Sequence, residues 1–362
     1  MNNERKKILH IILAIIALAA GLLLALAAVA LIIMNLPARQ QAENASAIWS
    51  DGTSVVQPDS VLTEQRTGMY VDGTSLRFAD GEQFVMRGVN HAHCWYTAED
   101  ETALDAIAAT GANAVRIVCA NGIQWESDTG ESIHYMIDET VGRGMVAIVE
   151  IHDGTGSDDP EVLEQIVDFW CDNAGIFEGT QDYCILNIAN EWCGSWNSKL
   201  WRDGYVSVIA RLREAGIDNV IMVDAPGWGQ YGRGIDRFGL EVFNSDPQHN
   251  TMFSVHMYGL SGRTRQTIRY NLEAATKQNL CVCVGEFGYT HSDGDVKEDF
   301  LMEYCEANDI GYLGWSWKGN SGGVEYLDIA QEWDGTALTP EWGEKLINGE
   351  FGIRNTSKQR KK

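Results

Sequence analysis

Two glutamates in this sequence each stand at the end of an apolar run with strand character. Glu191 follows YCILNIAN (residues 183–190), and Glu286 ends LCVCVGE (residues 280–286). Buried parallel strands appear as continuous apolar runs, and their carboxyl ends meet at one edge of a sheet. Two carboxyl groups at such an edge could cleave a glycosidic bond, because one protonates the leaving oxygen while the other attacks the anomeric carbon.

Eight strand-like runs alternate with runs of helical period from residue 84 onward. The strand-like runs are FVMRGVN (84–90), NAVRIV (113–118), MVAIVEIH (145–152), YCILNIAN (183–190), NVIMVD (219–224), MFSVHMY (252–258), LCVCVGE (280–286) and GYLGWSW (311–317). The helical runs are 99–110, 132–141, 160–173, 199–214, 263–278, 296–307 and a last one near 340–347. The stretch after residue 224 is rich in glycine, and we predict that it is poorly helical.

This alternation predicts a closed (β/α)8 barrel. The alternative, an open doubly wound sheet, needs a glycine-rich phosphate loop after its first strand, and GVNHAHCW at residues 88–95 is not one. Before the barrel, residues 69–90 alternate and turn at two Asp-Gly pairs, which predicts an N-terminal β-hairpin.

The first 66 residues have the composition of an export segment followed by a linker. Residues 11–33 carry no charge, which is long enough to cross a hydrocarbon core of about 30 Å, and the basic residues before them indicate a cytoplasmic start. We predict a transmembrane anchor over 1–36, with a cleavable signal peptide as the alternative, and a polar linker over 37–66. The catalytic domain is expected at 67–350, on the extracellular face of the membrane or in the medium. A basic tail is expected at 351–362, with its basic run 358–362 as a solvated, frayed terminus.

Charge and cysteine content exclude several classes of partner. A net charge of −24 argues against nucleic-acid binding, which needs clustered lysine and arginine. The eight cysteines include no CxxC pair, so the sequence does not predict a zinc cluster, and we expect neither a metal nor a cofactor. Export permits disulfides, for which the best candidates are Cys94, Cys171, Cys193 and Cys305, with the pairing left open. We expect a monomer.

Polar and aromatic residues gather at the predicted strand ends, where the chemistry of such a barrel is located. They are Asn90, His91, Arg116, His152, Asp153, Asn190, Asp224, His256, Tyr258, Trp315 and Trp317. Any one of them could be structural: Arg116 could neutralise a buried carboxylate, and the two tryptophans could fill the core. His91 and His93 could bind a metal, but no third ligand is evident, so we expect substrate contacts instead. Tryptophans in the following loops, including Trp228, could line an open cleft for a polysaccharide.

Seven motifs in order extend this pattern to a known family. RGVNHAH, GANAVRIV, EIHD, NIANEW, SVHMY, VGEFG and WSWKGN, spread over residues 87–320, resemble glycoside hydrolase family 5 of clan A. GVNHAH, VDAPGWGQY and GWSWKGN are similar to its bacterial endo-β-1,4-mannanase branch. The resemblance covers residues 69–348 and excludes the anchor and the linker.

The resemblance implies a role for each site residue. Glu191 matches the acid/base and Glu286 the nucleophile of a retaining endo-β-1,4-mannanase that acts on mannan-type polysaccharides. The substrate-binding set comprises Arg116, His152, Asn190, His256, Tyr258 and Trp315, with Trp317 as the rival for Trp315. The shape of the pocket around Asn190, His91 and Trp228 should separate mannan from cellulose. The alternatives are an endo-β-1,4-glucanase on the same scaffold and a catalytically weak, membrane-tethered glycan-binding barrel.

Overall fold

The computed structural model describes residues 67–360. The predicted anchor over 1–36 and the linker over 37–66 lie outside these residues. Within residues 67–360, no helix has the length and apolar character needed to cross a membrane.

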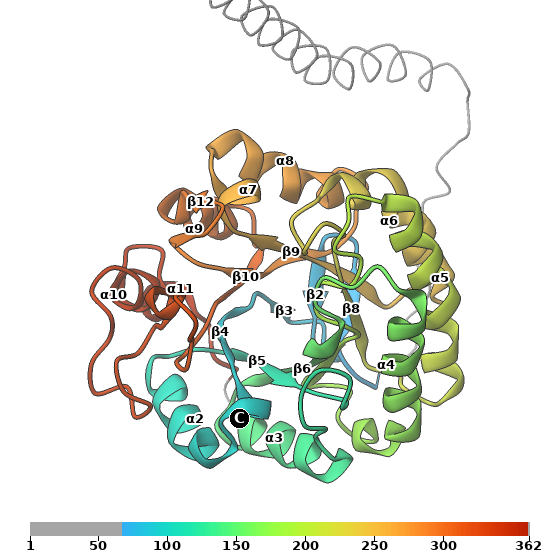
Figure 1. The fold of residues 1–362 in the computed structure, drawn as a ribbon, viewed down its shortest axis with the longest axis horizontal. Coiled ribbons are helices and arrows are strands. Elements are labelled where there is room, and N and C mark those ends of the chain that lie inside the picture. Colours follow the sequence, from blue (N-terminus) through green and yellow to red (C-terminus); the bar gives the residue numbers. More distant parts are fainter. Residues whose placement is uncertain (1–66, 361–362) are drawn as a thin grey trace, which may run out of the picture. The chain divides into compact units, whose positions relative to one another are not determined.

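Eight parallel strands form a closed barrel (Figure 1). They are β4 (Arg87–His91), β5 (Ala114–Cys119), β6 (Val146–Ile151), β7 (Cys184–Asn187), β8 (Val220–Asp224), β9 (Thr251–Met257), β10 (Val282–Phe287) and β13 (Gly311–Gly314). The barrel closes because β13 pairs with both β10 and β4. The predicted (β/α)8 architecture is confirmed, and each predicted strand is present within a few residues of its expected position.

Helices surround the barrel and cover the outer face of its strands (Figure 1). The longer ones are α2 (Asp100–Ala109), α3 (Gly130–Gly142), α4 (Pro160–Asp172), α5 (Ser198–Glu214), α6 (Arg233–Ser245), α8 (Arg265–Thr276) and α9 (Glu298–Ala307), and the shorter ones are α7 (Gly259–Gly262), α10 (Gly343–Asn348) and α11 (Ile353–Thr356). Polar side chains cap several of them: Thr129, Asp159 and Asn197 each accept a backbone N–H from the first turn of α3, α4 and α5.

Helix α6 corrects the expectation of a poorly helical stretch after residue 224. Its buried face is Gly234, Ile235, Gly239 and Val242, which recur at helical spacing. A Cβ atom at Gly239 would lie 3.0 Å from the Leu280 side chain, so the glycine lets the helix approach the barrel closely. The free energy gained by packing this face against the barrel outweighs the low helix propensity of glycine. Propensity alone takes no account of tertiary packing, so it did not predict the helix.

An antiparallel sheet closes the amino-terminal end of the barrel. Its strands β1 (Tyr70–Asp72), β2 (Ser75–Arg77) and β3 (Gln83–Phe84) extend the predicted hairpin by one strand. Apolar residues from both parts form one core inside the barrel: Val71, Leu76, Phe78 and Phe84 from the sheet region with Ile148, Ile185, Met222 and Met252 from barrel strands. This cluster fills the half of the barrel interior nearer the amino ends of the strands.

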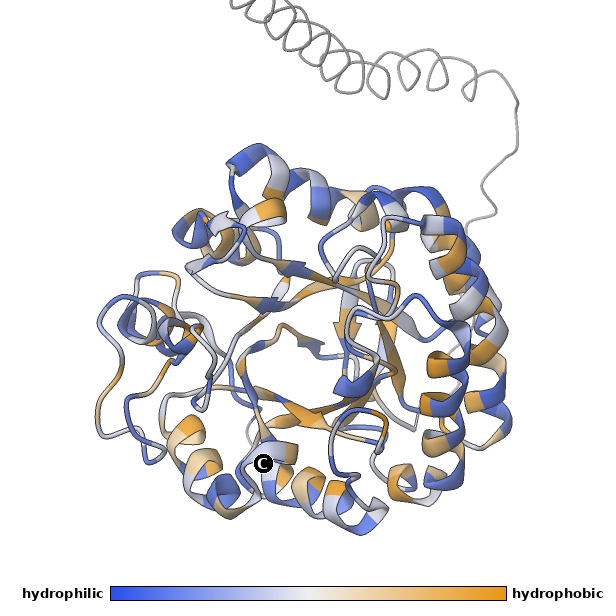
Figure 2. Ribbon diagram, in the orientation of Figure 1, coloured by the Kyte–Doolittle hydropathy of each residue, from blue (hydrophilic) through white to orange (hydrophobic). Residues whose placement is uncertain are grey.

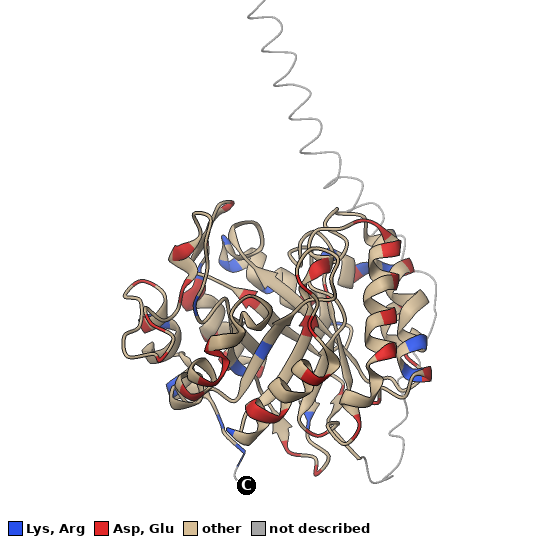
Figure 3. Cartoon of the chain, turned by 60° about the horizontal axis from the view of Figure 1, so that its bottom comes forward, with Lys and Arg blue, Asp and Glu red and all other residues tan. Residues whose placement is uncertain are grey.

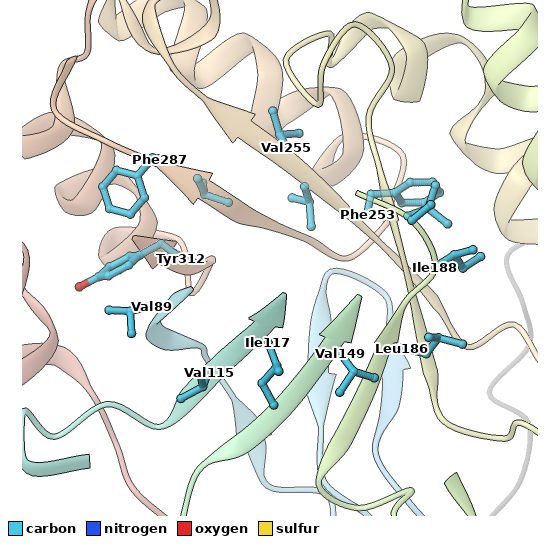
Figure 4. Packing of buried hydrophobic residues seen from close by; sticks show 14 of the residues in the cluster. Val89, Val115, Ile117, Val149, Leu186, Ile188, Phe253, Val255, Phe287 and Tyr312 are labelled. Atoms are coloured by element: carbon cyan, nitrogen blue, oxygen red, sulfur yellow. The ribbon is translucent and has the colours of Figure 1, made fainter. Parts of the chain in front are cut away.

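A second apolar cluster fills the space between the strands and the helices. Figure 4 shows Val89, Val115, Ile117, Val149 and Val255 among its members. Successive residues of a strand point to opposite faces, so these side chains alternate with those that point into the barrel. The strands are accordingly more hydrophobic than the outer faces of the helices (Figure 2). All eight cysteines lie within residues 67–360 and are free, so the candidates Cys94, Cys171, Cys193 and Cys305 form no disulfide.

The basic tail packs against the domain as far as residue 360. The Arg360 guanidinium pairs with Asp182 and Asp80, at 2.7 Å in each case, and lies 4.3 Å from the centre of the Phe78 ring. The expectation of a frayed terminus over 358–362 is therefore wrong for residues 358–360. Acidic groups are abundant on the surface (Figure 3), and two of them hold the tail in place.

Candidate active site

The half of the barrel interior nearer the carboxyl ends of the strands is polar, and it adjoins the apolar core of the other half. Four buried polar residues each stand two positions after an apolar core residue on the same strand: Arg116 after Ala114, Glu150 after Ile148, Asn187 after Ile185 and Asp224 after Met222. Because side chains alternate with period two, each pair points into the barrel, one layer above the other. The strands thus bring a set of charged and amide groups together at their carboxyl ends.

Arg116 lies at the centre of this polar layer and is fully buried. Its Nη1 donates to Glu286 Oε1 at 2.8 Å and to Asn90 Oδ1 at 3.0 Å. Its Nη2 donates to Asn190 Oδ1 at 2.8 Å, and its Nε donates to Asn187 Oδ1 at 2.9 Å. The planar guanidinium therefore fixes the orientation of Glu286 and Asn190, which arrive from different strands.

An irregularity in β10 aims Glu286 into the barrel. Val284 is paired with Val255 of β9, but Glu286 is paired with His256, so one extra residue, Gly285, is accommodated between them. Without this shift, Glu286 and the inward-facing Cys283 would point to opposite faces. A Cβ atom at Gly285 would lie 2.2 Å from Ser254 Oγ, so any side chain at this position would force Ser254 to move.

Glu286 is held by two hydrogen-bond donors on opposite oxygens. Tyr258 donates its hydroxyl to Oε2 at 2.9 Å, and Arg116 donates to Oε1. Burial raises the pKa of Glu286 above its usual range, the nearby positive charges of His256 and Arg116 oppose this rise, and the charge of Glu191 adds to it. The carboxylate is oriented for attack, with both of its oxygens fixed.

Glu191 lies close to Glu286 and has an unusual backbone. The residue adopts φ 45°, in the left-handed region that non-glycine residues seldom occupy, and its N–H donates to Asp224 Oδ2 at 3.0 Å. One carboxylate oxygen of Glu191, one of Glu286 and one ring nitrogen of His256 all lie within 4.8 Å of one another. Retaining glycosidases have carboxyl groups about 5–5.5 Å apart, whereas inverting ones need about 6.5–9.5 Å, so the spacing fits retention.

His256 connects the two glutamates. Its Nδ1 lies 2.7 Å from Glu191 Oε1 and 3.5 Å from Glu286 Oε2. Burial lowers its pKa, but the charges of Glu286 and Asp224 and hydrogen bonds to Asp224 and Glu191 outweigh burial and raise the pKa well above the usual value. Glu191, His256 and Glu286 are of residue types that bind metals. However, the protonated His256 ring and the Arg116 guanidinium bring two positive charges to this place, which disfavours a bound cation.

Aromatic rings form one wall of the site around His152. Trp315 stacks on the imidazole with ring centres 5.4 Å apart, and the rings of Trp95 and Trp125 contact it from other directions. The Trp315 indole donates to Asn320 Oδ1 at 2.9 Å. Trp317 is only 1% exposed and donates instead to the carbonyl of Trp333, so the structure brings Trp315, and not its rival, to the site.

Trp228 is presented on the rim by a left-handed turn. Gly227, Trp228 and Gly229 have φ values of 68°, 58° and 66°. The indole covers Gly156, where an added Cβ atom would lie 2.2 Å from the ring, and it remains 49% exposed. Gly229 lies against the His256 ring. The turn therefore carries the exposed Trp228 ring and also packs on the histidine that contacts both glutamates.

Comparison with known proteins agrees with this geometry. The family model described as cellulase (glycosyl hydrolase family 5) matches residues 78–321. The chain belongs to glycoside hydrolase family 5. It is 47% identical to a mannan endo-1,4-beta-mannosidase of Salipaludibacillus agaradhaerens over 80% of this chain and 94% of that protein.

Two further relatives of this family 5 enzyme are also mannan-degrading by name. A mannan endo-1,4-beta-mannosidase of Streptomyces lividans is 40% identical over 80% of this chain and 76% of its own length. The mannohexaose complex of a Thermomonospora fusca beta-mannanase superposes with a TM-score of 0.76 at 37% identity, and the match covers 81% of this chain and 98% of the other.

His91 does not join the active site of the family 5 enzyme. Its side chain is fully buried, and its Nε2 lies 2.7 Å from Asp100 Oδ1 at the start of α2. His93 binds the other oxygen of Asp100, at 2.8 Å. Burial lowers the pKa of His93, but Asp100 and Asp128 outweigh it and raise the pKa to about 9, so the cluster is ionic at neutral pH. The expected substrate contact of His91 is wrong, because a fully buried ring has no surface to offer a sugar.

Two buried residues of the site were not singled out from the sequence. Glu150 accepts from His152 at 2.8 Å, and Asn187 accepts from Arg116. Both point into the barrel with the same alternation as the residues that were predicted. The sequence did contain a signal for such residues: a single polar residue at an inward position of an otherwise apolar strand. In MVAIVEIH, Glu150 stands two positions before His152 and therefore lies on the same face of the strand.

The pKa of Glu286 leads to a prediction for the pH profile of the family 5 enzyme. Glu286 must be ionised to attack, and its pKa is raised, so we expect kcat/KM to fall on acidification at a pH above that typical of exposed glutamates. Because each carboxyl affects the other, the midpoint belongs to the pair. A pH–rate profile measures it, and an acid limb at or below the range of an exposed glutamate would contradict this expectation.

Proposed function

We propose that this chain is a retaining endo-β-1,4-mannanase that hydrolyses mannan-type polysaccharides. The observation that carries the mechanism is the separation of Glu191 and Glu286: one carboxylate oxygen of each lies within 4.8 Å of the other in a polar, largely buried site. The substrate assignment is supported by relatives at 40–47% identity that are named for mannan and by a neighbour that binds mannohexaose.

In the first step, Glu286 attacks the anomeric carbon and forms a glycosyl ester, while Glu191 transfers a proton to the departing oxygen. Positive charge develops on the sugar as the glycosidic bond breaks, and the carboxylate of Glu286 stabilises it. Arg116 and Tyr258 keep that carboxylate in one orientation, so little reorganisation is needed at the moment of attack.

In the second step, Glu191 removes a proton from water, and the resulting hydroxide displaces Glu286 from the sugar. The sugar leaves with its original anomeric configuration because it has been inverted twice. His256 contacts both glutamates, so its charge supports Glu191 each time that this residue becomes ionised.

Asn190 and Trp228 are the residues that we assign to selection of mannose. The Asn190 side chain is held by Arg116 and by Thr155 Oγ1 at 2.8 Å, next to the two glutamates. From there its amide could bond the sugar 2-hydroxyl, which is axial in mannose and equatorial in glucose. The exposed ring of Trp228 offers a stacking surface for a neighbouring sugar of the chain.

We also propose that residues 1–36 anchor a monomeric enzyme at the extracellular face of the membrane, or direct its secretion if they are cleaved. The charge-free run at 11–33 and the basic residues before it support this localisation. Fractionation of cells that produce the full chain tests it, because an anchored enzyme remains in the membrane fraction and a cleaved one appears in the medium.

Hydrolysis of a panel of β-mannans and β-glucans tests the substrate. We expect reducing ends to appear rapidly from mannan and slowly from carboxymethylcellulose, internal cleavage to give oligosaccharides of several lengths, and the first-formed products to have the β configuration by NMR. Faster cleavage of the glucan would favour the endoglucanase alternative. Tight binding of mannan without turnover would favour the glycan-binding barrel, and α products would contradict retention.

A further inference from the structure

A short hairpin follows the strand that carries Glu286. It consists of β11 (Thr290–His291) and β12 (Gly294–Asp295) and has Asp293 in its turn. Asp293 bonds to the segment after β9, at the start of the short helix α7: its Oδ1 accepts the N–H of Gly259 at 2.8 Å, and its Oδ2 accepts the N–H of Leu260 at 2.9 Å. These two amides come directly after Tyr258, which donates to Glu286.

The hairpin and this loop are in direct backbone contact. A Cβ atom at Gly259 would lie 2.3 Å from both Asp293 C and Gly294 N, so no side chain fits between the two segments. The His291 ring packs on the Tyr258 ring with centres 4.9 Å apart, and Arg263 donates to the Asp293 carbonyl at 3.0 Å. The segment after β9 is therefore joined to β10 by the Tyr258–Glu286 bond, and to the hairpin after β10 through Asp293 and the His291 ring.

A third loop joins the same network through Gln230, which follows the Trp228 turn. Gln230 Nε2 lies 3.4 Å from Asp293 Oδ2, and Gln230 Oε1 accepts the N–H of Ser261 at 3.3 Å. Ser261 Oγ donates to the carbonyl of His256 at 2.7 Å and accepts the N–H of Tyr258. Asp293 thus holds the segment 256–261 directly at Gly259 and Leu260 and, through Gln230, at Ser261. Two side chains of this segment, His256 and Tyr258, contact the glutamates.

We infer that Asp293 is a positioning residue for the nucleophile: through the amides of Gly259 and Leu260 it keeps the Tyr258 hydroxyl on Glu286. This role rests on the proposed function, because it takes Glu286 as the attacking group. Gly259 and Gly262 are the first and last residues of α7, so the backbone next to Tyr258 has wide conformational freedom when Asp293 does not restrain it. Misplacement of a catalytic group by 1 Å can cost about 10²-fold in rate.

The test compares Asp293→Ala with a matched variant of the same hairpin, Asp295→Ala. Asp295 accepts from Thr290 Oγ1 at 2.8 Å, within the hairpin, so its replacement loosens the hairpin without removing the bonds to Gly259 and Leu260. We expect kcat to fall about tenfold in Asp293→Ala, in line with loss of charge-assisted hydrogen bonds, with KM changed less than about twofold. Asp295→Ala should stay within about twofold of the wild type.

The pH profile and a double mutant separate positioning from general stability. Asp293→Ala should move the acid limb of kcat/KM upward, because Glu286 loses a donor to its charged form, and Tyr258→Phe should do the same. In the Tyr258→Phe background, Asp293→Ala should change kcat by less than about twofold, because the bond that it protects is already absent. Independent, multiplicative losses would overturn the inference, as would equal losses in Asp293→Ala and Asp295→Ala.

Rates are expressed per folded molecule, from circular dichroism, and if Asp293→Ala does not fold, Asp293→Asn takes its place. Asparagine keeps one acceptor oxygen, so a loss of about threefold with a smaller shift of the acid limb is expected, and a wild-type profile would overturn the inference. The substrate panel decides separately between mannan and glucan. Because either substrate uses the same pair of glutamates, the comparison is made on whichever one the wild type cleaves, and failure of the mannan assignment is distinct from failure of Asp293.

Discussion

Replacement of Glu286 by alanine is expected to abolish measurable hydrolysis of mannan, a loss of at least about 10⁴-fold in kcat. The alanine has no oxygen that could form the glycosyl ester, and no other carboxylate can take its place, because Glu191 is needed as the acid. Turnover is measured as reducing-sugar release from galactomannan at matched concentrations of folded enzyme. Retention of a tenth or more of the wild-type rate would show that Glu286 is not the nucleophile.

Two controls make this result specific. Arg116 would lose a charged partner but would keep its bonds to Asn90, Asn187 and Asn190, so we expect Glu286→Ala to fold, which circular dichroism checks. The small cavity that it leaves could admit azide, which would attack an activated mannosyl substrate from the side of the missing carboxylate. A glycosyl azide of inverted, α configuration is then expected, because only one displacement takes place.

Glu191→Gln is expected to show the second-largest effect, and one that depends on the leaving group. On mannan, whose departing hydroxyl needs a proton, kcat should fall by about 10²–10⁴-fold, the usual contribution of a general acid. A dinitrophenyl glycoside has a leaving group that departs without a proton, so its first step should stay within about tenfold of the wild type. The second step still needs a base, so the glycosyl ester should accumulate and give a burst of dinitrophenol.

The burst separates the two glutamates. Glu286→Gln, which has the same substitution at the other position, should give no burst, because it cannot form the ester. Rapid-quench measurement of dinitrophenol in both variants makes the comparison. An equal loss on mannan and on the dinitrophenyl glycoside in Glu191→Gln would contradict its role as acid, and a burst in Glu286→Gln would reverse the two assignments.

The sequence was sufficient to predict the barrel and most of the site, for a physical reason. Buried parallel strands must be apolar, and side chains at their carboxyl ends meet in space, so Arg116, His152, Glu191 and Glu286 could be placed together without coordinates. The same argument selected His91 wrongly, because a position at a strand end does not tell whether the side chain points to the mouth of the barrel or behind the first helix.

Features that depend on packing between distant segments were not predictable. The extra residue at Gly285 decides which face Glu286 takes, and it is visible only in the pairing of β10 with β9. Helix α6 contains glycines that propensity disfavours, and the tail is held through Arg360 by acids far away in the chain. In each case the decisive contact lies between residues that the sequence separates widely.

The left-handed backbone of Glu191 has a consequence for the stability of inactive variants. A side chain with a β-carbon at φ 45° costs roughly 1 kcal/mol relative to glycine, and asparagine tolerates this region better than glutamate does. The backbone conformation at position 191 therefore lowers the free energy of unfolding, while it places the carboxyl group for catalysis. Asparagine at this position relieves the backbone strain but gives up the 2.7 Å contact with His256, so we expect the two effects to offset and the variant to melt close to the active enzyme. Such a variant would be suited to trapping intact oligosaccharides in crystals.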